Sequence, residues 1–189
     1  MDNKLYVVHH SKGLEAPALP SSLLPLSREG VLLTTPVAEA SFWNSVAAIY
    51  SSPELRAVQT AEIIAKRWQL PLYLVDDLRD MWLTSAGLEP DHLVDIVGDH
   101  LEGKVSHQLL EPYDAAQERI VRCVQRLARE NTDRNFAIVS HARILIPFYS
   151  HLFGRRLGRN EWLSIRSPDL SVINHHTWQV TAGFFSEFK

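Results

Sequence analysis

Short apolar runs alternate with helix-like stretches along this chain, and that alternation limits the possible folds more than any other feature. Four runs rich in β-forming residues have the length of buried strands, at residues 5–8, 47–50, 72–75 and 136–139. Stretches of helical periodicity separate them, most regularly over residues 112–130. The pattern predicts an α/β fold: a three-layer sandwich with a mostly parallel central sheet and helices on both faces.

Other segments carry weaker signals. Residues 36–46 are expected to form a helix that starts at a proline, and residues 92–97 a short helix. A further helix is expected over residues 144–153, just before Gly154. Two late segments, 170–173 and 177–180, are expected to be edge strands.

Size and charge restrict the possible partners. A length of 189 residues suits a single domain over residues 1–189. The net charge of −3 provides no broad basic surface, so we expect no nucleic-acid partner. Any phosphate binding must then come from a local pocket. The sequence is compatible with a monomer or a homodimer.

Cysteine usage and hydropathy suggest a compartment. Cys123 is the only cysteine, so an internal disulfide is impossible, and its position on an expected helix predicts a core residue. No apolar run approaches the length needed to cross a bilayer. We therefore expect a cytoplasmic protein without a membrane partner.

Chemically capable side chains follow each of the four expected strands. In open α/β sheets, ligands bind beyond the carboxyl ends of the strands. The residues placed there are His9, His10, Arg56, Asp80, His141 and Arg143. Arginine binds phosphate oxygens bidentately, a neutral imidazole is a competent nucleophile, and a carboxylic acid can protonate a leaving oxygen. Each residue alone is unremarkable, but together they predict phosphoryl chemistry.

Several segments resemble the motifs of the histidine phosphatase superfamily, which includes the phosphoglycerate mutases. Residues 49–61, Ile-Tyr-Ser-Ser-Pro-Glu-Leu-Arg-Ala-Val-Gln-Thr-Ala, are very similar to its second motif. Further similarities lie at residues 5–11 (the strand and Arg-His-Gly turn), 26–30, 78–80 (Leu-Arg-Glu), Glu111 with Arg119, and 139–141 (Val-Ser-His). The order and spacing of these segments make chance similarity improbable.

The resemblance implies a role for each matched residue. His10 would accept the phosphoryl group as a phosphohistidine, Arg56 would bind the phosphate, and His141 would stabilise it from the other side. Asp80 would donate the proton in place of the family's glutamate. The implied substrate is a small phosphorylated molecule, and neither a metal nor an organic cofactor is implied.

The first motif departs from the family pattern. His9 stands where the family has arginine, and Ser11 where it has glycine. A lost guanidinium contact corresponds to about 4 kcal/mol at 4 Å and an effective dielectric constant near 20. Lys12 and Arg143 are the two nearby cations that can compensate, so His9, Ser11, Lys12 and Arg143 join Arg56 as candidate phosphate-binding residues.

Three functions are consistent with this set. The first is a phosphomonoester hydrolase that acts through phospho-His10. The second is a catalytically degenerate family member that serves as a binding or scaffold protein. The third is an enzyme repurposed for acid–base chemistry on a substrate without phosphate. A mutase is disfavoured because the chain lacks a long insertion or a basic cluster suited to a bisphosphate.

Overall fold

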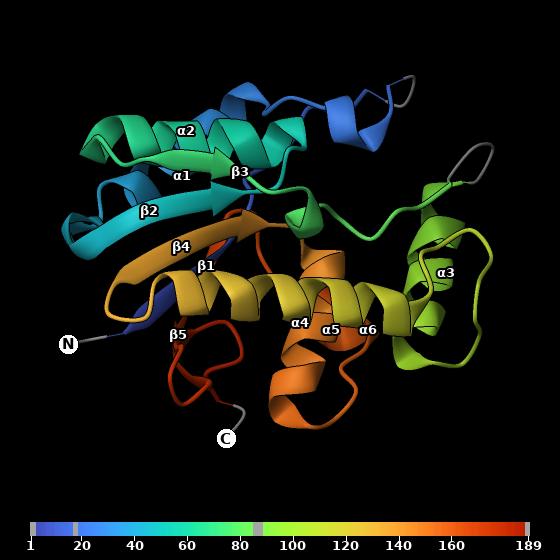
Figure 1. Ribbon diagram of the computed structural model, residues 1–189. Coiled ribbons are helices and arrows are strands. Elements are labelled where there is room, and N and C mark those ends of the chain that lie inside the picture. Colours follow the sequence, from blue (N-terminus) through green and yellow to red (C-terminus); the bar gives the residue numbers. More distant parts are fainter. Residues whose placement is uncertain (1–2, 17–18, 85–88, 188–189) are drawn as a thin grey trace.

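A six-stranded sheet forms the centre of the computed structural model, which describes residues 3–16, 19–84 and 89–187 (Figure 1). The strand order is β3-β2-β4-β1-β5-β6. The strands are β1 (Lys4–His9), β2 (Val46–Ser51), β3 (Leu72–Leu74), β4 (Asn135–Ser140), β5 (Asp169–Asn174) and β6 (Gln179–Gly183). The first four are parallel, whereas β5 runs antiparallel to β1 and β6 antiparallel to β5.

Helices cover both faces of the sheet. The α-helices are α1 (Arg28–Ala38), α2 (Leu55–Trp68), α3 (Pro90–Glu102), α4 (Tyr113–Glu130), α5 (Ala142–Phe153) and α6 (Arg159–Ser164). Short 3₁₀ turns are η1 (Ser21–Leu23), η2 (Ser41–Ser45) and η3 (Asp76–Leu78). Helices α1 and α2 pack on one face, and α4 and α5 on the other (Figure 1). The predicted three-layer α/β sandwich is confirmed.

Burial on both faces explains why the first strand is apolar without alternation. Leu5 and Val7 face the core beneath α4 and α5, while Tyr6 and Val8 face the core beneath α1 and α2. Successive side chains of a strand point to opposite faces, so a central strand needs an apolar residue at every position. The strand therefore delivers the polar residues that follow it to the sheet's carboxyl edge.

The prediction of a helix over residues 36–46 is wrong. Helix α1 ends at Ala38, and a 3₁₀ turn and β2 occupy the rest of that range. The helix begins after Ser27, whose Oγ accepts the Gly30 N–H at 3.0 Å. Its buried residues, Gly30, Thr34 and Ala38, are small, while Leu32 on its outer side is exposed. The usual apolar stripe is therefore absent, and the sequence pattern conceals the helix.

Three later elements also differ from the expectation. Helix α3 is longer than residues 92–97, and helix α6 was not predicted at all. Strand β6 begins two residues later than expected, because Trp178 closes a turn by donating its N–H to the Asn174 carbonyl at 2.7 Å. Both helices lie beside the site described below.

Cys123 is buried in the core, as its place on a helix predicts. Burial raises the pKa of its thiol to about 11, so it is not a reactive thiolate at neutral pH. Within the described residues, no helix combines the length and the hydropathy that a membrane crossing requires.

Candidate active site

The carboxyl ends of three adjacent parallel strands bring the two central histidines together. His10 follows β1 and donates its backbone N–H to the Ser140 carbonyl at 3.1 Å. His141 follows β4, which lies between β1 and β2. The ring centroids of His10 and His141 are 4.9 Å apart. Residues that are 131 positions apart thus share one site because their strands pair.

The His10 ring is held in the tautomer that a nucleophile needs. Its Nδ1 lies 2.7 Å from the Ser11 carbonyl oxygen, which can only accept a hydrogen bond. Nδ1 therefore carries the proton, and Nε2 keeps its lone pair. Burial, together with His9 and His141, holds the pKa of His10 well below its usual value, so the ring is neutral at neutral pH.

His141 is placed to support a group bound at His10. Its Nε2 lies 2.7 Å from Ser52 Oγ, and that hydroxyl oxygen accepts the Glu54 N–H at 3.2 Å. Among the described residues, the buried Nδ1 of His141 has no hydrogen-bond partner. Burial lowers the pKa of His141 to about 3, so this ring is also neutral.

Arg56 carries a guanidinium with unused hydrogen-bonding capacity. The residue lies in the first turn of α2, and its buried Nε has no partner in the described part of the chain. Its nearest charged contact is Glu54, with 3.8 Å between Nη2 and Oε2. An unpaired buried donor is costly unless a ligand occupies it, which suits an anion site.

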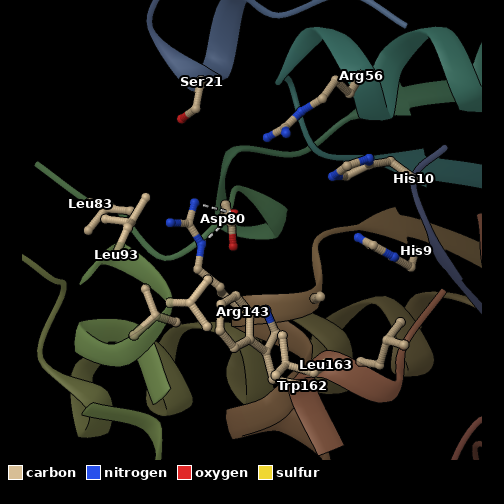
Figure 2. Close-up of a pocket in the computed structure, with 14 residues that line it drawn as sticks. His9, His10, Ser21, Arg56, Asp80, Leu83, Leu93, Arg143, Trp162 and Leu163 are labelled. Atoms are coloured by element: carbon tan, nitrogen blue, oxygen red, sulfur yellow. Dashed lines mark hydrogen bonds and ion pairs between the residues drawn. The ribbon is translucent and has the colours of Figure 1, made fainter. Parts of the chain in front are cut away.

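Asp80 and Arg143 form a tight ion pair across the site. Asp80 Oδ2 accepts from Arg143 Nε at 2.9 Å and from Nη2 at 2.5 Å (Figure 2). Burial alone would raise the pKa of the Asp80 carboxyl, but Arg143 and His141 outweigh it and lower the pKa to about 2. Paired with Arg143 in this way, Asp80 is ionised at neutral pH, which does not suit the proton-donor role that the resemblance implies.

Glu54 is a second carboxyl at the site, and the sequence analysis did not single it out. Its Oε1 accepts the Asp80 N–H at 2.8 Å and lies 3.8 Å from His141 Nε2. Burial and the neighbouring Asp80 raise the pKa of Glu54. The available signal was its position inside the most specific motif, two residues before Arg56.

A buried arginine on α4 fixes the loop that carries Asp80. Arg119 forms two hydrogen bonds with the Glu111 carboxylate, at 2.9 and 2.6 Å. It also donates to the carbonyls of Asp77, Arg79 and Asp80, at 2.7, 3.0 and 3.3 Å. The signal for this role was a charged residue on the otherwise apolar stripe of α4.

His9 lines the cavity but offers no positive charge. Its Nδ1 lies 2.5 Å from the Arg166 carbonyl oxygen, so Nδ1 carries the proton. Burial lowers its pKa, and the ring is neutral at neutral pH. The other ring nitrogen, Nε2, is therefore unprotonated and can only accept a hydrogen bond, at a position where the family pattern has a guanidinium.

Ser11 and Lys12 do not line the cavity. The buried Ser11 hydroxyl donates to the Gly30 carbonyl at 2.7 Å and links the first turn to α1. Lys12 Nζ forms an exposed ion pair with Glu29 at 2.7 Å. Of the two cations expected to replace the missing arginine, the structure places only Arg143 in the cavity.

The cavity has a volume of about 580 Å³, and the two histidines that line it lie on one side (Figure 2). His10 lies between Arg56 and His9 on that side, opposite the Asp80–Arg143 pair and a group of apolar side chains (Figure 2). In the described residues, no three His, Cys, Asp or Glu side chains are arranged to hold a metal ion. Neutral imidazoles, free guanidinium donors and buried carboxyls form a site suited to phosphoryl transfer.

The fold is an α/β sandwich whose sheet carries histidines, arginines and carboxyls at its carboxyl edge. The model of the histidine phosphatase superfamily (branch 1) matches residues 22–184. The chain therefore belongs to this superfamily. The match begins after His10, so the placement of the first motif rests on the geometry of β1. Comparison with curated proteins gave no match.

Solved structures of the same fold include several phosphatases and a mutase. Phosphoserine phosphatase from Entamoeba histolytica, in complex with 3-phosphoglyceric acid, has a TM-score of 0.75 at 15% identity, with 96% of each chain covered. Bacillus stearothermophilus YhfR has a TM-score of 0.70 at 22% identity, with 90% of each chain covered. Phosphoglycerate mutase from Bacillus anthracis has a TM-score of 0.73 at 18% identity, with 98% of this chain and 94% of that chain covered. At these identities the likeness establishes the fold.

Proposed function

We propose that this protein is a phosphomonoester hydrolase that acts through a phosphohistidine at His10. The observation that carries the proposal is the His10 tautomer, since its Nδ1 is engaged by the Ser11 carbonyl and Nε2 is left as a neutral nucleophile. Arg56, with unused donors, supplies the phosphate contact. The phosphatases among the solved structures of this fold support the same chemistry.

The proposed reaction has two steps. His10 Nε2 attacks phosphorus, forming an N–P bond as the ester P–O bond breaks, and the departing oxygen takes a proton from the Asp80 carboxyl. Water then attacks the phosphohistidine and gives a proton back to Asp80, so inorganic phosphate leaves and His10 is restored. His141, with its free Nδ1, stabilises the transferring group.

Substrate binding is what gives Asp80 its proton in this mechanism. The ion pair with Arg143 keeps Asp80 ionised. A phosphate group that attracts Arg143 weakens this pairing and adds a negative charge beside the carboxyl, and both changes raise the Asp80 pKa. Arg143 thereby also supplies the guanidinium that is absent at position 9.

The test compares the wild-type protein with His10→Ala. Wild-type protein incubated with a radiolabelled aryl phosphate is expected to acquire acid-labile, base-stable label and to release phosphate. The His10→Ala variant is expected to lose both signals, with turnover reduced at least about 10³-fold because the nucleophile is gone.

The control is Lys12→Ala, which changes a side chain outside the cavity and is expected to keep the label. Equal turnover by wild type and His10→Ala would overturn the proposal. Binding of vanadate without turnover of any phosphomonoester would instead indicate a protein that only binds phosphorylated ligands.

A further inference from the structure

The cavity has a second side that the phosphoryl chemistry does not use. Away from the histidines and from the Asp80–Arg143 pair, its walls are mostly apolar and come from segments far apart in the sequence (Figure 2). The apolar residues that line it are Leu83, Leu93, Val94, Val97, Ala142, Trp162, Leu163 and Ile165. Val94 and Leu163 remain 36% and 56% exposed, so a bound group would cover apolar surface that now faces water.

This apolar wall is held in place before any ligand arrives. Arg159 at the start of α6 forms ion pairs with Asp95 at 2.8 Å and Asp99 at 3.2 Å, both on α3. Gly98 permits the approach, since a Cβ there would lie 2.2 Å from Arg159 Nε. The side chains of the wall therefore lose little conformational entropy when a ligand binds.

The polar groups of the described lining residues suffice for one phosphate and little else. Arg56 and Arg143 serve the phosphoryl group, and Asp80 neutralises much of the Arg143 charge. Away from these, the hydroxyl of Ser21 is the only one among the described lining residues. Against the apolar wall, sugar hydroxyls or a second anionic group would lose water without gaining partners, which is unfavourable.

We propose that the substrates are phosphomonoesters of bulky apolar alcohols, whose hydrocarbon part lies against the wall formed by α3 and α6. This proposal rests on the phosphatase function proposed above. The cavity volume of about 580 Å³ falls in the range that accommodates a molecule larger than phosphate alone.

The experiment measures kcat/KM for n-alkyl phosphates from ethyl to octyl. Their leaving alcohols hardly differ in acidity beyond the first members, so differences report binding of the chain. We expect kcat/KM to rise about fourfold per CH₂ until the wall is covered. Glucose 6-phosphate and phosphoserine are expected to be poorer substrates than hexyl phosphate.

Two variants test whether the apolar wall causes the preference for longer alkyl chains. Leu163→Asn is expected to lower the ratio of hexyl to ethyl phosphate activity about tenfold. Because Leu163 is half-exposed, we expect the variant to keep its fold. Leu32→Asn, on the distant helix α1, is the matched control and is expected to leave the ratio unchanged. A flat or falling chain-length series, or a preference for glucose 6-phosphate, would overturn the substrate class.

Binding measurements distinguish failure of the proposed phosphatase function from failure of the proposed apolar subsite. If no ester is hydrolysed, the affinities of ethyl- and hexylphosphonate are compared by calorimetry. If hexylphosphonate binds more tightly than ethylphosphonate, and Leu163→Asn removes this difference, the ligand is an apolar phosphorylated molecule. Hydrolysis is then rejected, and the apolar subsite is retained. Equal affinities would reject the apolar subsite as well.

Discussion

At the scale of single residues, His9 and Arg143 redistribute the positive charge of the phosphate site. His9 is neutral, and its Nδ1 is engaged by the Arg166 carbonyl. Arg143 comes from the first turn of α5 and reaches the cavity from another strand end. In this protein a guanidinium is thus available, but Asp80 holds it until an anion competes for it.

The charge redistribution predicts different outcomes for two cation variants. Arg143→Ala is expected to lower kcat/KM for an aryl phosphate about 10- to 100-fold, because it removes charge-assisted hydrogen bonds to the phosphoryl group. Lys12→Ala is the matched control and is expected to stay within about twofold, since Lys12 pairs with Glu29 outside the cavity. Steady-state kinetics check both, and a larger effect at Lys12 would contradict this assignment.

At the scale of elements, α4 determines where the Asp80 loop lies. All three carbonyls that Arg119 contacts belong to the segment from Asp77 to Asp80, which links β3 to the cavity. The arginine is itself oriented by Glu111, just before the helix. A helix on one face of the sheet therefore positions a carboxyl at its edge.

Breaking that buried pair is expected to destabilise the protein. Arg119→Met leaves the Glu111 carboxylate buried without its partner, and the free energy of unfolding is expected to fall by about 3–5 kcal/mol. Arg122→Met is the control on the same helix, because it removes only an exposed pair with Glu118, worth about 0.5 kcal/mol at most. Urea denaturation followed by circular dichroism measures both, and similar losses would argue against a special role for Arg119.

At the scale of the whole molecule, the site places three neutral histidines in the interior. Burial lowers the pKa of His9, His10 and His141. An imidazole whose pKa is depressed by folding stays neutral in the folded state, while the same group in the unfolded chain takes up a proton. The folded state therefore loses stability as the pH falls below about 6.5, the ordinary histidine value.

This linkage predicts a pH-dependent stability. Between pH 6.5 and 5 the free energy of unfolding is expected to fall by up to about 1.4 kcal/mol per pH unit for each buried histidine. Glu54, with its raised pKa, opposes this trend as a single group, and Asp80 loses its contribution only as the pH falls toward 2. Urea denaturation at pH 7.5, 6 and 5 tests the slope, and His141→Asn is expected to reduce it. A free energy of unfolding that stays constant from pH 7.5 to 5 would contradict the burial of the three histidine rings in their neutral form.

An element of this fold could be predicted from the sequence when its own residues show a clear local pattern. The four parallel strands stand out as continuous apolar runs and helix α4 by its strong periodicity, and they are confirmed. Helix α1 was missed because it buries Gly30, Thr34 and Ala38 and leaves apolar side chains exposed. Helix α6 was missed because its six residues carry too little periodicity. Short elements of this kind depend on tertiary packing.

The sequence by itself determined the fold class and the set of polar residues at the strand ends, because alternation of apolar runs and the order of motifs are local properties. Only the tertiary structure decided which of those residues share the cavity. It placed Arg143 inside and Lys12 outside, paired Asp80 with Arg143, and lined the far side with α3 and α6. The physical reason is that side-chain pairing and pKa depend on burial and on neighbours distant in the chain, which sequence spacing does not record.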